Sequence, residues 1–248
     1  YLSYAVANRE PARTDFVESS TVSRPRSEQL HNIEAGYRIS YKKWKLNSTV
    51  YYMHYEDQLI LTGQLNDVGA YTRMNVDKSY RLGFEIDGAY QIVKSFSLNA
   101  NLALSRNKIV SFDEYIDNYD NYDSEGNMIQ DIIHHNNSDI AFSPSIIGGI
   151  GFTYIPVRNF SIGWFTKYVG RQYLDNSQSN DRMLSAYSTS SINLSYTLYN
   201  VFFKEIQFGV LVNNVFNKRY ANNGYTWGFV SGGERVIENF VFAQAGTN

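Results

Sequence analysis

The 248-residue chain contains no cysteine, which excludes disulfide scaffolds, thiolate metal sites and cysteine nucleophiles. Its four prolines and 17 glycines are too few for a collagen-like or disordered chain. It also lacks a surplus of basic residues, with 22 Lys and Arg against 24 Asp and Glu, so we expect no nucleic-acid partner. The mean hydropathy of −0.38 excludes a bundle of membrane helices. A membrane β-barrel stays open, because only one face of its strands is apolar.

Long apolar helices are missing as well. Two uncharged windows, 140–157 and 183–203, are long enough to cross a bilayer. The first contains Pro144 and Pro156, which would break a helix. In the second, apolar residues alternate with Ser, Thr, Asn and Tyr. We therefore expect no transmembrane helix in either window.

What the chain has is a period of two. In segment 80–92 the even positions are apolar or glycine, whereas the odd positions include Arg81, Glu85 and Asp87. Successive side chains of a strand point to opposite faces, so this segment has one apolar and one charged surface. The same alternation recurs in 33–42, 96–107, 159–172, 192–198 and 206–213. These runs exceed the about 5–6 residues of soluble strands and match the length of a bilayer-crossing strand.

The connections between these segments alternate in length. Short turns are expected at 42–45, 93–95, 156–158 and 200–204, and long connections at 61–75, 108–143, 174–186 and 218–235. Short periplasmic turns opposite long extracellular loops are typical of outer-membrane barrels, and Tyr and Trp near strand ends (Tyr51 among them) fit interfacial girdles. The sequence thus predicts an all-β, antiparallel transmembrane β-barrel portion of about 9–10 strands. Partial strands at 1–7 and 238–248 lead us to expect a piece of a larger barrel.

Several stretches together resemble a known family. They are SYAVANREPARTDFVES (3–19), RPRSEQLHNIEAGYR (24–38), NVDKSYRLGFEIDGAYQ (75–91), FTKYVGRQYLDNS (165–177) and LVNNVFNKRYANNGY (211–225). With 46–69 and 139–152, these stretches cover most of the chain outside 108–138. The chain resembles the C-terminal barrel portion of a TonB-dependent outer-membrane receptor of the Bacteroidota type.

This resemblance implies a 22-stranded barrel with an N-terminal plug in its lumen. Residues 1–248 would be a single C-terminal part of that barrel, with the plug domain and the end of the terminal strand not present. Such receptors sit in the outer membrane, crossing its lipid many times. They bind a scarce small ligand outside the cell and import it with energy from the TonB–ExbB–ExbD complex, which contacts the plug. A ferric siderophore is the favoured ligand, as the commonest in the family; cobalamin, haem and glycans are others. No cofactor and no enzymatic activity are implied.

Polar residues of the barrel interior are the first candidates for function. They would form a charge-balanced wall against a plug, or contact plug or ligand directly: Glu34, Arg38, Arg81, Glu85, Asp87, Lys167 and Arg171. The expected long loop 108–143 carries eight acidic residues and, after Lys108, no Lys or Arg. Long loops with aromatic anchors are often binding elements, so ligand-contact candidates there are Tyr115, Tyr119, Tyr122, His134 and His135. A solvated acidic loop and a calcium site are the alternatives.

Other chemistries find little support. His134 and His135 are adjacent in an extended segment and should point apart, so we expect no transition-metal site. Ser231 lacks the G-x-S-x-G order of a nucleophile elbow. Two alternative functions stay open. An outer-membrane enzyme on a smaller barrel would need a Ser or Asp/His constellation at one rim. A soluble β-rich surface glycan-binding protein would bury its apolar face.

Overall fold

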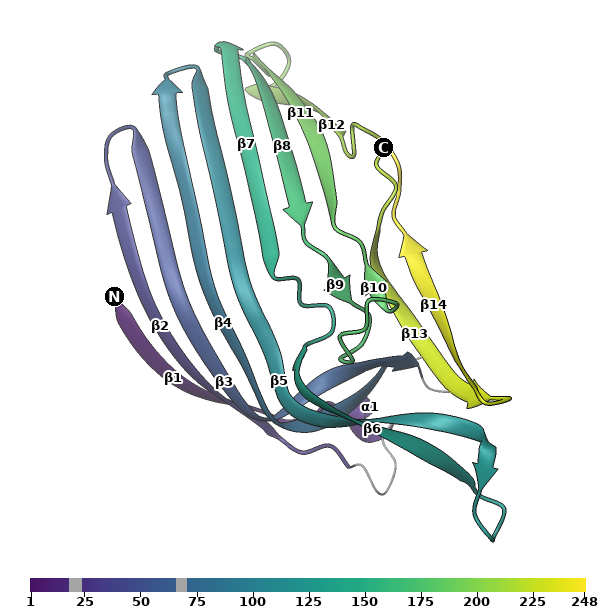
Figure 1. Cartoon of the computed structure of the whole chain (residues 1–248). Helices are drawn as coiled ribbons and strands as arrows, with labels where there is room; N and C mark the ends of the chain where they lie inside the picture. Colours follow the sequence, from purple (N-terminus) through teal and green to yellow (C-terminus); the bar gives the residue numbers. More distant parts are fainter. Residues whose placement is uncertain (18–23, 66–70) are drawn as a thin grey trace.

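The computed structural model describes residues 1–17, 24–65 and 71–248, which form a bent wall of long strands (Figure 1). The elements in chain order are β1 (Leu2–Arg9), α1 (Arg13–Val17), β2 (Glu28–Ser40), β3 (Trp44–Leu65), β4 (Tyr71–Val93), β5 (Phe96–Tyr122), β6 (Met128–Asp139), β7 (Ile146–Val157), β8 (Phe160–Val169), β9 (Gln172–Tyr173), β10 (Met183–Leu184), β11 (Tyr187–Tyr199), β12 (Glu205–Val212), β13 (Ala221–Ser231) and β14 (Glu234–Ala243). The all-β class is confirmed.

Nine strands follow one another across the wall in the order β1-β2-β3-β4-β5-β7-β8-β11-β12. Each pairs antiparallel with its neighbours. β6 pairs with the far part of β5, and β13 forms a hairpin with β14. The described residues make an open portion of a barrel, in agreement with the predicted architecture.

The register gives the wall two different faces. One row across six strands contains Leu2, Ala35, Val50, Phe84, Leu104 and Ile146. Another row, on the opposite face, contains Arg38, Asn47, Asp87, Asn101, Gly149 and Lys167. We call these surfaces the apolar face and the polar face. Large side chains of the apolar face are open to the surroundings, Val50 at 49% and Phe84 at 38% exposure.

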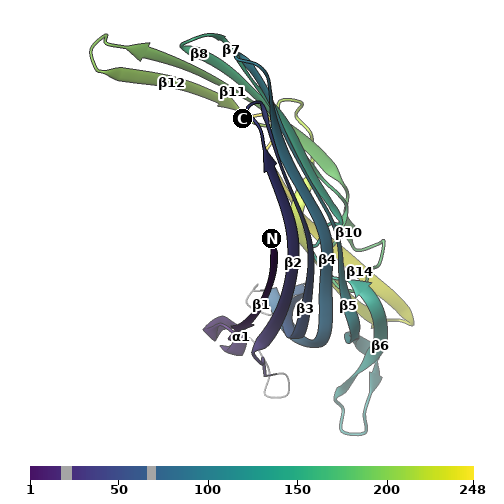
Figure 2. The ribbon, with the colours of Figure 1, turned by 90° about the vertical axis from the view of Figure 1, so that its left-hand side faces the viewer.

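The two ends of the wall also differ. Tight turns join β2 to β3, β4 to β5, β7 to β8 and β11 to β12 at the upper end of Figure 1, which we call the short-turn end. These are the four short turns that the sequence predicts. In Figure 2 the β11–β12 hairpin projects away from the other strands at this end.

At the opposite, long-loop end, the predicted long connections between wall strands are present, but most of them are ordered as strands. In the segment 108–143, which joins the wall part of β5 to β7, β5 continues to Tyr122 and pairs with β6. β13 occupies most of 218–235, and β3 and β4 extend into 61–75, of which 66–70 lie outside the described residues. Apolar Val110, Phe112 and Ile116 still occupy even positions of β5, but Glu114 and the other acidic residues interrupt this pattern. Only 174–186 is mostly irregular, as predicted.

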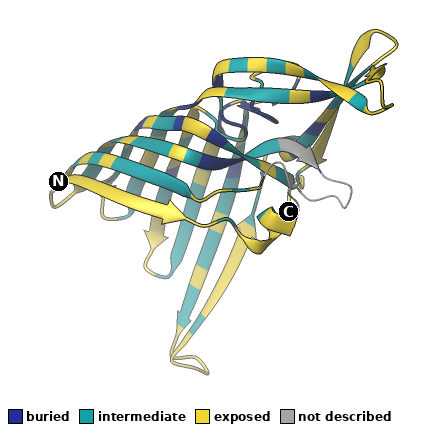
Figure 3. Ribbon diagram, turned by 90° about the horizontal axis from the view of Figure 1, so that it is seen from below, coloured by how far each residue is buried: buried dark blue, intermediate teal, exposed yellow. Residues whose placement is uncertain are grey.

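The long-loop end has a small hydrophobic core. Ile60, Val76, Ile109 and Ile140 are buried together, with Met74 and Phe112 packed against them. Leu174, in the connection between β9 and β10, is fully buried as well. Figure 3 shows the contrast with β1, which is exposed along its length. This core lets the extensions of β3, β4 and β5 stay ordered beyond the wall.

We expect Ile109→Ala to destabilise this end by about 2–5 kcal/mol, because Ile109 is completely buried and the substitution leaves a cavity. Amide hydrogen exchange in β5 and β6 should accelerate accordingly. Val110→Ala is the matched control, since Val110 is 47% exposed on the opposite side of the strand. Equal acceleration in both variants would contradict the role of this core.

Candidate functional site

The polar face carries a connected row of side chains. Arg38 Nε donates to Asn47 Oδ1 at 2.9 Å, and Asn47 Nδ2 donates to Asp87 Oδ2 at 2.9 Å. The register continues this row to Lys167 on β8. Alternation thus brings three of the predicted charged residues onto one row, where hydrogen bonding fixes two of them through a shared asparagine.

Three further predicted residues line a cavity of about 500 Å³ on the same face, namely Glu34, Arg81 and Glu85. Arg81 Nη1 donates to Asn107 Oδ1 at 3.2 Å and to Ser143 Oγ at 3.1 Å. The Ser143 bond ties the wall to the segment Phe142–Pro144, which also lines the cavity. The cavity is therefore a charged recess between β2–β5 and the chain leading into β7.

Arg171 departs from the prediction. β8 ends at Val169, so Arg171 lies beyond the strand, with its guanidinium carbon 6.0 Å from the centre of the Tyr173 ring. The Gly170 amide still donates to the Ile146 carbonyl at 2.8 Å, and the chain then leaves the wall.

Tyr51 is a second correction. We expected it in an interfacial girdle, but it lines the charged recess. Its ring lies over Gly83, where an added Cβ would come within 2.3 Å of Tyr51 Cζ. A glycine at 83 is what allows this close approach, and it is the reason that the aromatic ring can lie on the polar face.

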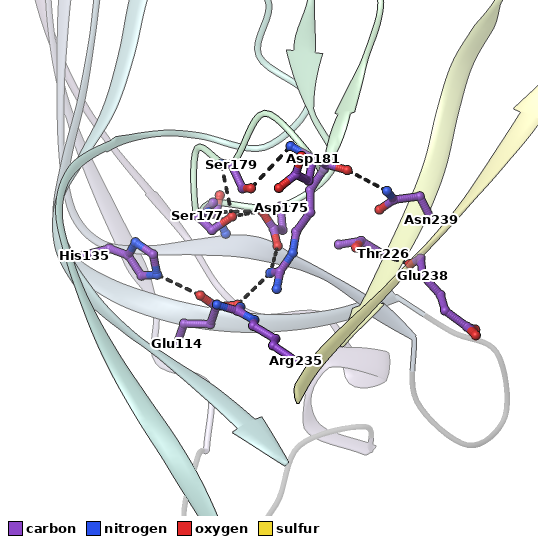
Figure 4. A network of polar contacts seen from close by, with 12 residues as sticks. Glu114, His135, Asp175, Ser177, Ser179, Asp181, Thr226, Arg235, Glu238 and Asn239 are labelled. Atoms are coloured by element: carbon purple, nitrogen blue, oxygen red, sulfur yellow. Dashed lines mark hydrogen bonds and ion pairs between the residues drawn. The ribbon is translucent and has the colours of Figure 1, made fainter. Parts of the chain in front are cut away.

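At the long-loop end, charged side chains from four elements meet around one carboxylate (Figure 4). Glu114 accepts hydrogen bonds from Arg182 Nη1 at 2.6 Å, Arg235 Nη2 at 2.9 Å and, across the hairpin, His135 Nε2 at 2.7 Å. Arg182 also donates to Asp175 Oδ2 at 2.5 Å. We call these five residues the Glu114 cluster. It joins the β5–β6 hairpin, the β9–β10 connection and β14.

Burial and charge act in opposite directions within this cluster. Burial raises the pKa of Glu114, but hydrogen bonds from Arg182 and His135 and the charges of both arginines outweigh it, so this pKa lies below its ordinary value. The pKa of Arg182 lies above its ordinary value, because Asp175 and Glu114 overcome the effect of burial. Both groups are thus ionised at neutral pH, although the Arg182 side chain is only 3% exposed.

A second anchor holds the tip of the β13–β14 hairpin. Gly232 and Gly233 have φ angles of +64° and +75°, as the central residues of a tight hairpin turn require. Their amides donate to the two carboxylate oxygens of Asp120 at 2.8 Å each. These bonds lower the pKa of Asp120 below its usual value. Nearby, Phe229 and Val230 pair in parallel with Asp117 and Asn118.

The five ligand-contact candidates have separate environments. Tyr115, Tyr119 and Tyr122 are all exposed, and the Tyr119 ring also packs edge-on against Phe229 with ring centres 5.6 Å apart. His134 Nδ1 bonds Asp113 at 2.7 Å, and His135 stacks on Phe112 and bonds Glu114. The two histidines point to different partners, as predicted for an extended segment. Among residues 1–17, 24–65 and 71–248, no three His, Asp or Glu side chains gather closely enough to hold a metal ion.

Sequence reasoning missed Asp175, Arg182 and Arg235. Asp175 and Arg182 lie in a stretch rich in Ser, Asn and Asp, which is typical of solvated loops. In the structure, Gln172–Asn176 are all buried. Asn176 explains part of this, since it bonds the Ala141 amide at 2.8 Å and the Leu61 carbonyl at 2.7 Å. No local pattern could have linked these partners.

The sequence model of the protein family described as "TonB dependent receptor-like, beta-barrel" matches residues 1–215 of this chain. The chain belongs to the TonB-dependent receptor family. No curated protein sequence matches this receptor chain. Within the described part of the receptor, no helix combines the length and apolarity that a membrane crossing needs.

Solved structures resemble the receptor chain in fold. The copper transporter OprC has 17% identity and a TM-score of 0.64 over 97% of this chain and 36% of its own. The FrpB iron transporter from Neisseria meningitidis (F5-1 variant) has 16% identity and a TM-score of 0.59 over 97% of this chain and 37% of its own. The ferric yersiniabactin uptake receptor FyuA from Yersinia pestis has 18% identity and a TM-score of 0.58 over 89% of this chain and 29% of its own. The receptor chain thus spans about a third of the length of these structures.

In the full-length receptor, we expect Glu114→Gln to loosen the long-loop end by about 3–5 kcal/mol, because it leaves Arg182 and Arg235 without their shared charge. Hydrogen exchange should accelerate in 172–184 and at the β13–β14 tip. The wild type should lose the same contribution only at acid pH. The lowered pKa of Glu114 means that this stabilisation is complete above the ordinary carboxyl value and declines as pH falls through the lowered one.

Asp113→Asn is the matched control for Glu114→Gln. Asp113 also lies on β5 and also bonds a histidine, His134, but the side chains of Asp113 and His134 are both about half exposed. A change below about 1 kcal/mol is expected. If Asp113→Asn loosens the 172–184 segment as much as Glu114→Gln does, the cluster is not what holds this end together.

Proposed function

We propose that the chain supplies the C-terminal part of the barrel wall of an outer-membrane receptor, which imports a scarce ligand with energy delivered by TonB. Family membership and the division of the wall into an apolar and a polar face carry this proposal. The apolar face would meet lipid, and the polar face would meet water and a plug. A ferric siderophore is the favoured ligand class, since structures of similar fold include a ferric yersiniabactin uptake receptor and an iron transporter.

The charged recess is the part of the wall best suited to contact the plug or ligand. Its two carboxylates and one guanidinium come from β2 and β4, on either side of β3, and of these three groups Arg81 is hydrogen-bonded across to the segment leading into β7. Tyr115 and Tyr122 offer exposed aromatic surface at the long-loop end for a ligand arriving from outside. The histidines would instead serve to hold the β5–β6 hairpin. No catalytic step is part of this function.

The assignment of faces is tested by placing one charge on either side of β5. Leu102→Arg should cost about 2–4 kcal/mol, because it puts a charge on the lipid face, and should reduce the heat-modifiable receptor recovered from outer membranes. Asn101→Arg, one residue away on the polar face opposite Asp87, should assemble normally. The reverse pattern would place the apolar face away from lipid.

Transport is tested with the full-length receptor in cells that lack other iron receptors, using radioactive iron in a panel of ferric siderophores. Uptake should require TonB. Arg81→Gln should reduce uptake roughly tenfold at equal surface levels, as the loss of one charge-assisted contact would. Lys78→Gln, on the same strand outside the recess, should not. The siderophore assignment would be overturned if the receptor bound cobalamin, haem or oligosaccharides but no ferric siderophore. It would also be overturned if expression of the receptor did not change under iron starvation.

A further inference from the structure

Basic residues predominate at the short-turn end, where Glu205 follows Lys204 as the first residue of β12. The four turns between the paired strands contain five basic residues and no acidic one: Lys42, Lys43, Lys94, Arg158 and Lys204. All five are exposed. At the long-loop end, residues 109–139 contain eight acidic residues and no Lys or Arg, and Arg182 and Arg235 lie beside them. The wall therefore has a basic rim at the end where the strands are joined tightly.

Three of these basic residues gather at two neighbouring turns. The Gln91 amide donates to the Lys43 carbonyl at 2.7 Å, which joins the β2–β3 turn to the end of β4. Gln91 Nε2 donates to the Lys94 carbonyl at 3.5 Å. The two turns are therefore neighbours on the rim, and together they contribute Lys42, Lys43 and Lys94. The nearest acid along β4, Asp87, belongs to the polar face and bonds Asn47 there.

The apolar face is hollowed beside these two turns. A groove of about 330 Å³ is lined mainly by Trp44, Leu46, Gly88, Tyr90, Leu98, Ala100 and Ile150. Its floor is low because Gly88 and Ala100 are paired across β4 and β5, between Leu46 and Ile150 in the same row. Leu46 borders this space, with its Cδ1 atom 3.3 Å from where a Cβ at position 88 would lie.

Aromatic rings mark the boundary between groove and rim. Trp44, at the edge of the groove, packs against Tyr41 with ring centres 5.0 Å apart. Both rings flank Lys42 and Lys43 in the chain. Rings of this kind prefer the level of lipid headgroups. An apolar hollow, an aromatic boundary and basic residues beyond it match one amphiphile, a lipid with an anionic head and an acyl tail.

We propose that this place is a binding site for an anionic phospholipid. One acyl chain lies in the groove over Gly88 and Ala100, and the phosphate contacts Lys42, Lys43 and Lys94. The site rests on the proposed function in one respect, that the apolar face meets lipid. It goes beyond that function because it assigns a specific lipid to two turns, and it would fix the depth of the wall in the membrane at its short-turn end.

The test is lipid binding by the full-length receptor in detergent, measured by native mass spectrometry during titration with phosphatidylglycerol. Lys43→Gln/Lys94→Gln should weaken binding about 25-fold, at roughly fivefold for each lysine near a headgroup. Arg158→Gln/Lys204→Gln removes the same charge from the other two turns and should change binding less than twofold. Equal losses in the two double variants would show a diffuse basic rim and overturn the site.

The groove is tested separately. Ala100→Leu fills its floor and leaves every charge in place, so it should also weaken phosphatidylglycerol binding severalfold. Should this variant fail to assemble, the wild type provides the answer: phosphatidylglycerol with brominated acyl chains should quench fluorescence that Trp44→Phe removes. No quenching of Trp44, or equal binding of diacylglycerol, which lacks the phosphate, would overturn the proposal. A receptor that binds lipid in this way but fails to transport would refute only the proposed function.

Discussion

The hydrogen-bonded register between neighbouring strands decides where every side chain of the wall lies. It places Phe84 between Val50 and Leu104, and Asp87 between Asn47 and Asn101. A slip of one residue in any strand would exchange its two faces, because the side-chain period is two. The strongly amphipathic pattern of β4 makes such a slip costly, and the side-chain bonds from Arg38 through Asn47 to Asp87 favour the observed pairing further. The charged recess and the apolar groove both follow from this register.

Different forces organise the long-loop end. There the strands leave the regular wall, and buried aliphatic residues and ion pairs add to strand-to-strand pairing. Glu114 alone contacts three other segments, and Asn176 bridges two more through its amide. Paired charges of this kind contribute little net stability over apolar packing, but they are expensive to separate singly. They therefore hold several hairpins in one arrangement, where an apolar surface would permit sliding.

The wall could be predicted from the sequence, and the long-loop end could not. Alternation in 80–92 and 96–107 fixed the strands and the sharing of one face by Arg81, Glu85 and Asp87, because it depends on neighbours in sequence. The acidic residues of 108–139 looked like a solvated loop, yet they lie in paired strands. Arg182 and Arg235 went unnoticed because their contacts with Glu114 span 68 and 121 residues, and Asp175 because it joins the cluster only through Arg182. Tyr51 was misplaced because its role depends on the absent side chain of Gly83 across the sheet.

The capture of the β13–β14 tip by Asp120 has a consequence for how the protein is made. The contact joins residues 112 and 113 positions apart, and the parallel pairing of β13 with β5 is equally distant in sequence. Closing so long a segment is unfavourable until β7, β8, β11 and β12 have shortened the path between its ends. The β13–β14 hairpin should therefore dock on β5 only after β7, β8, β11 and β12 have paired. Its docking then marks a late step in folding, after the intervening strands have formed.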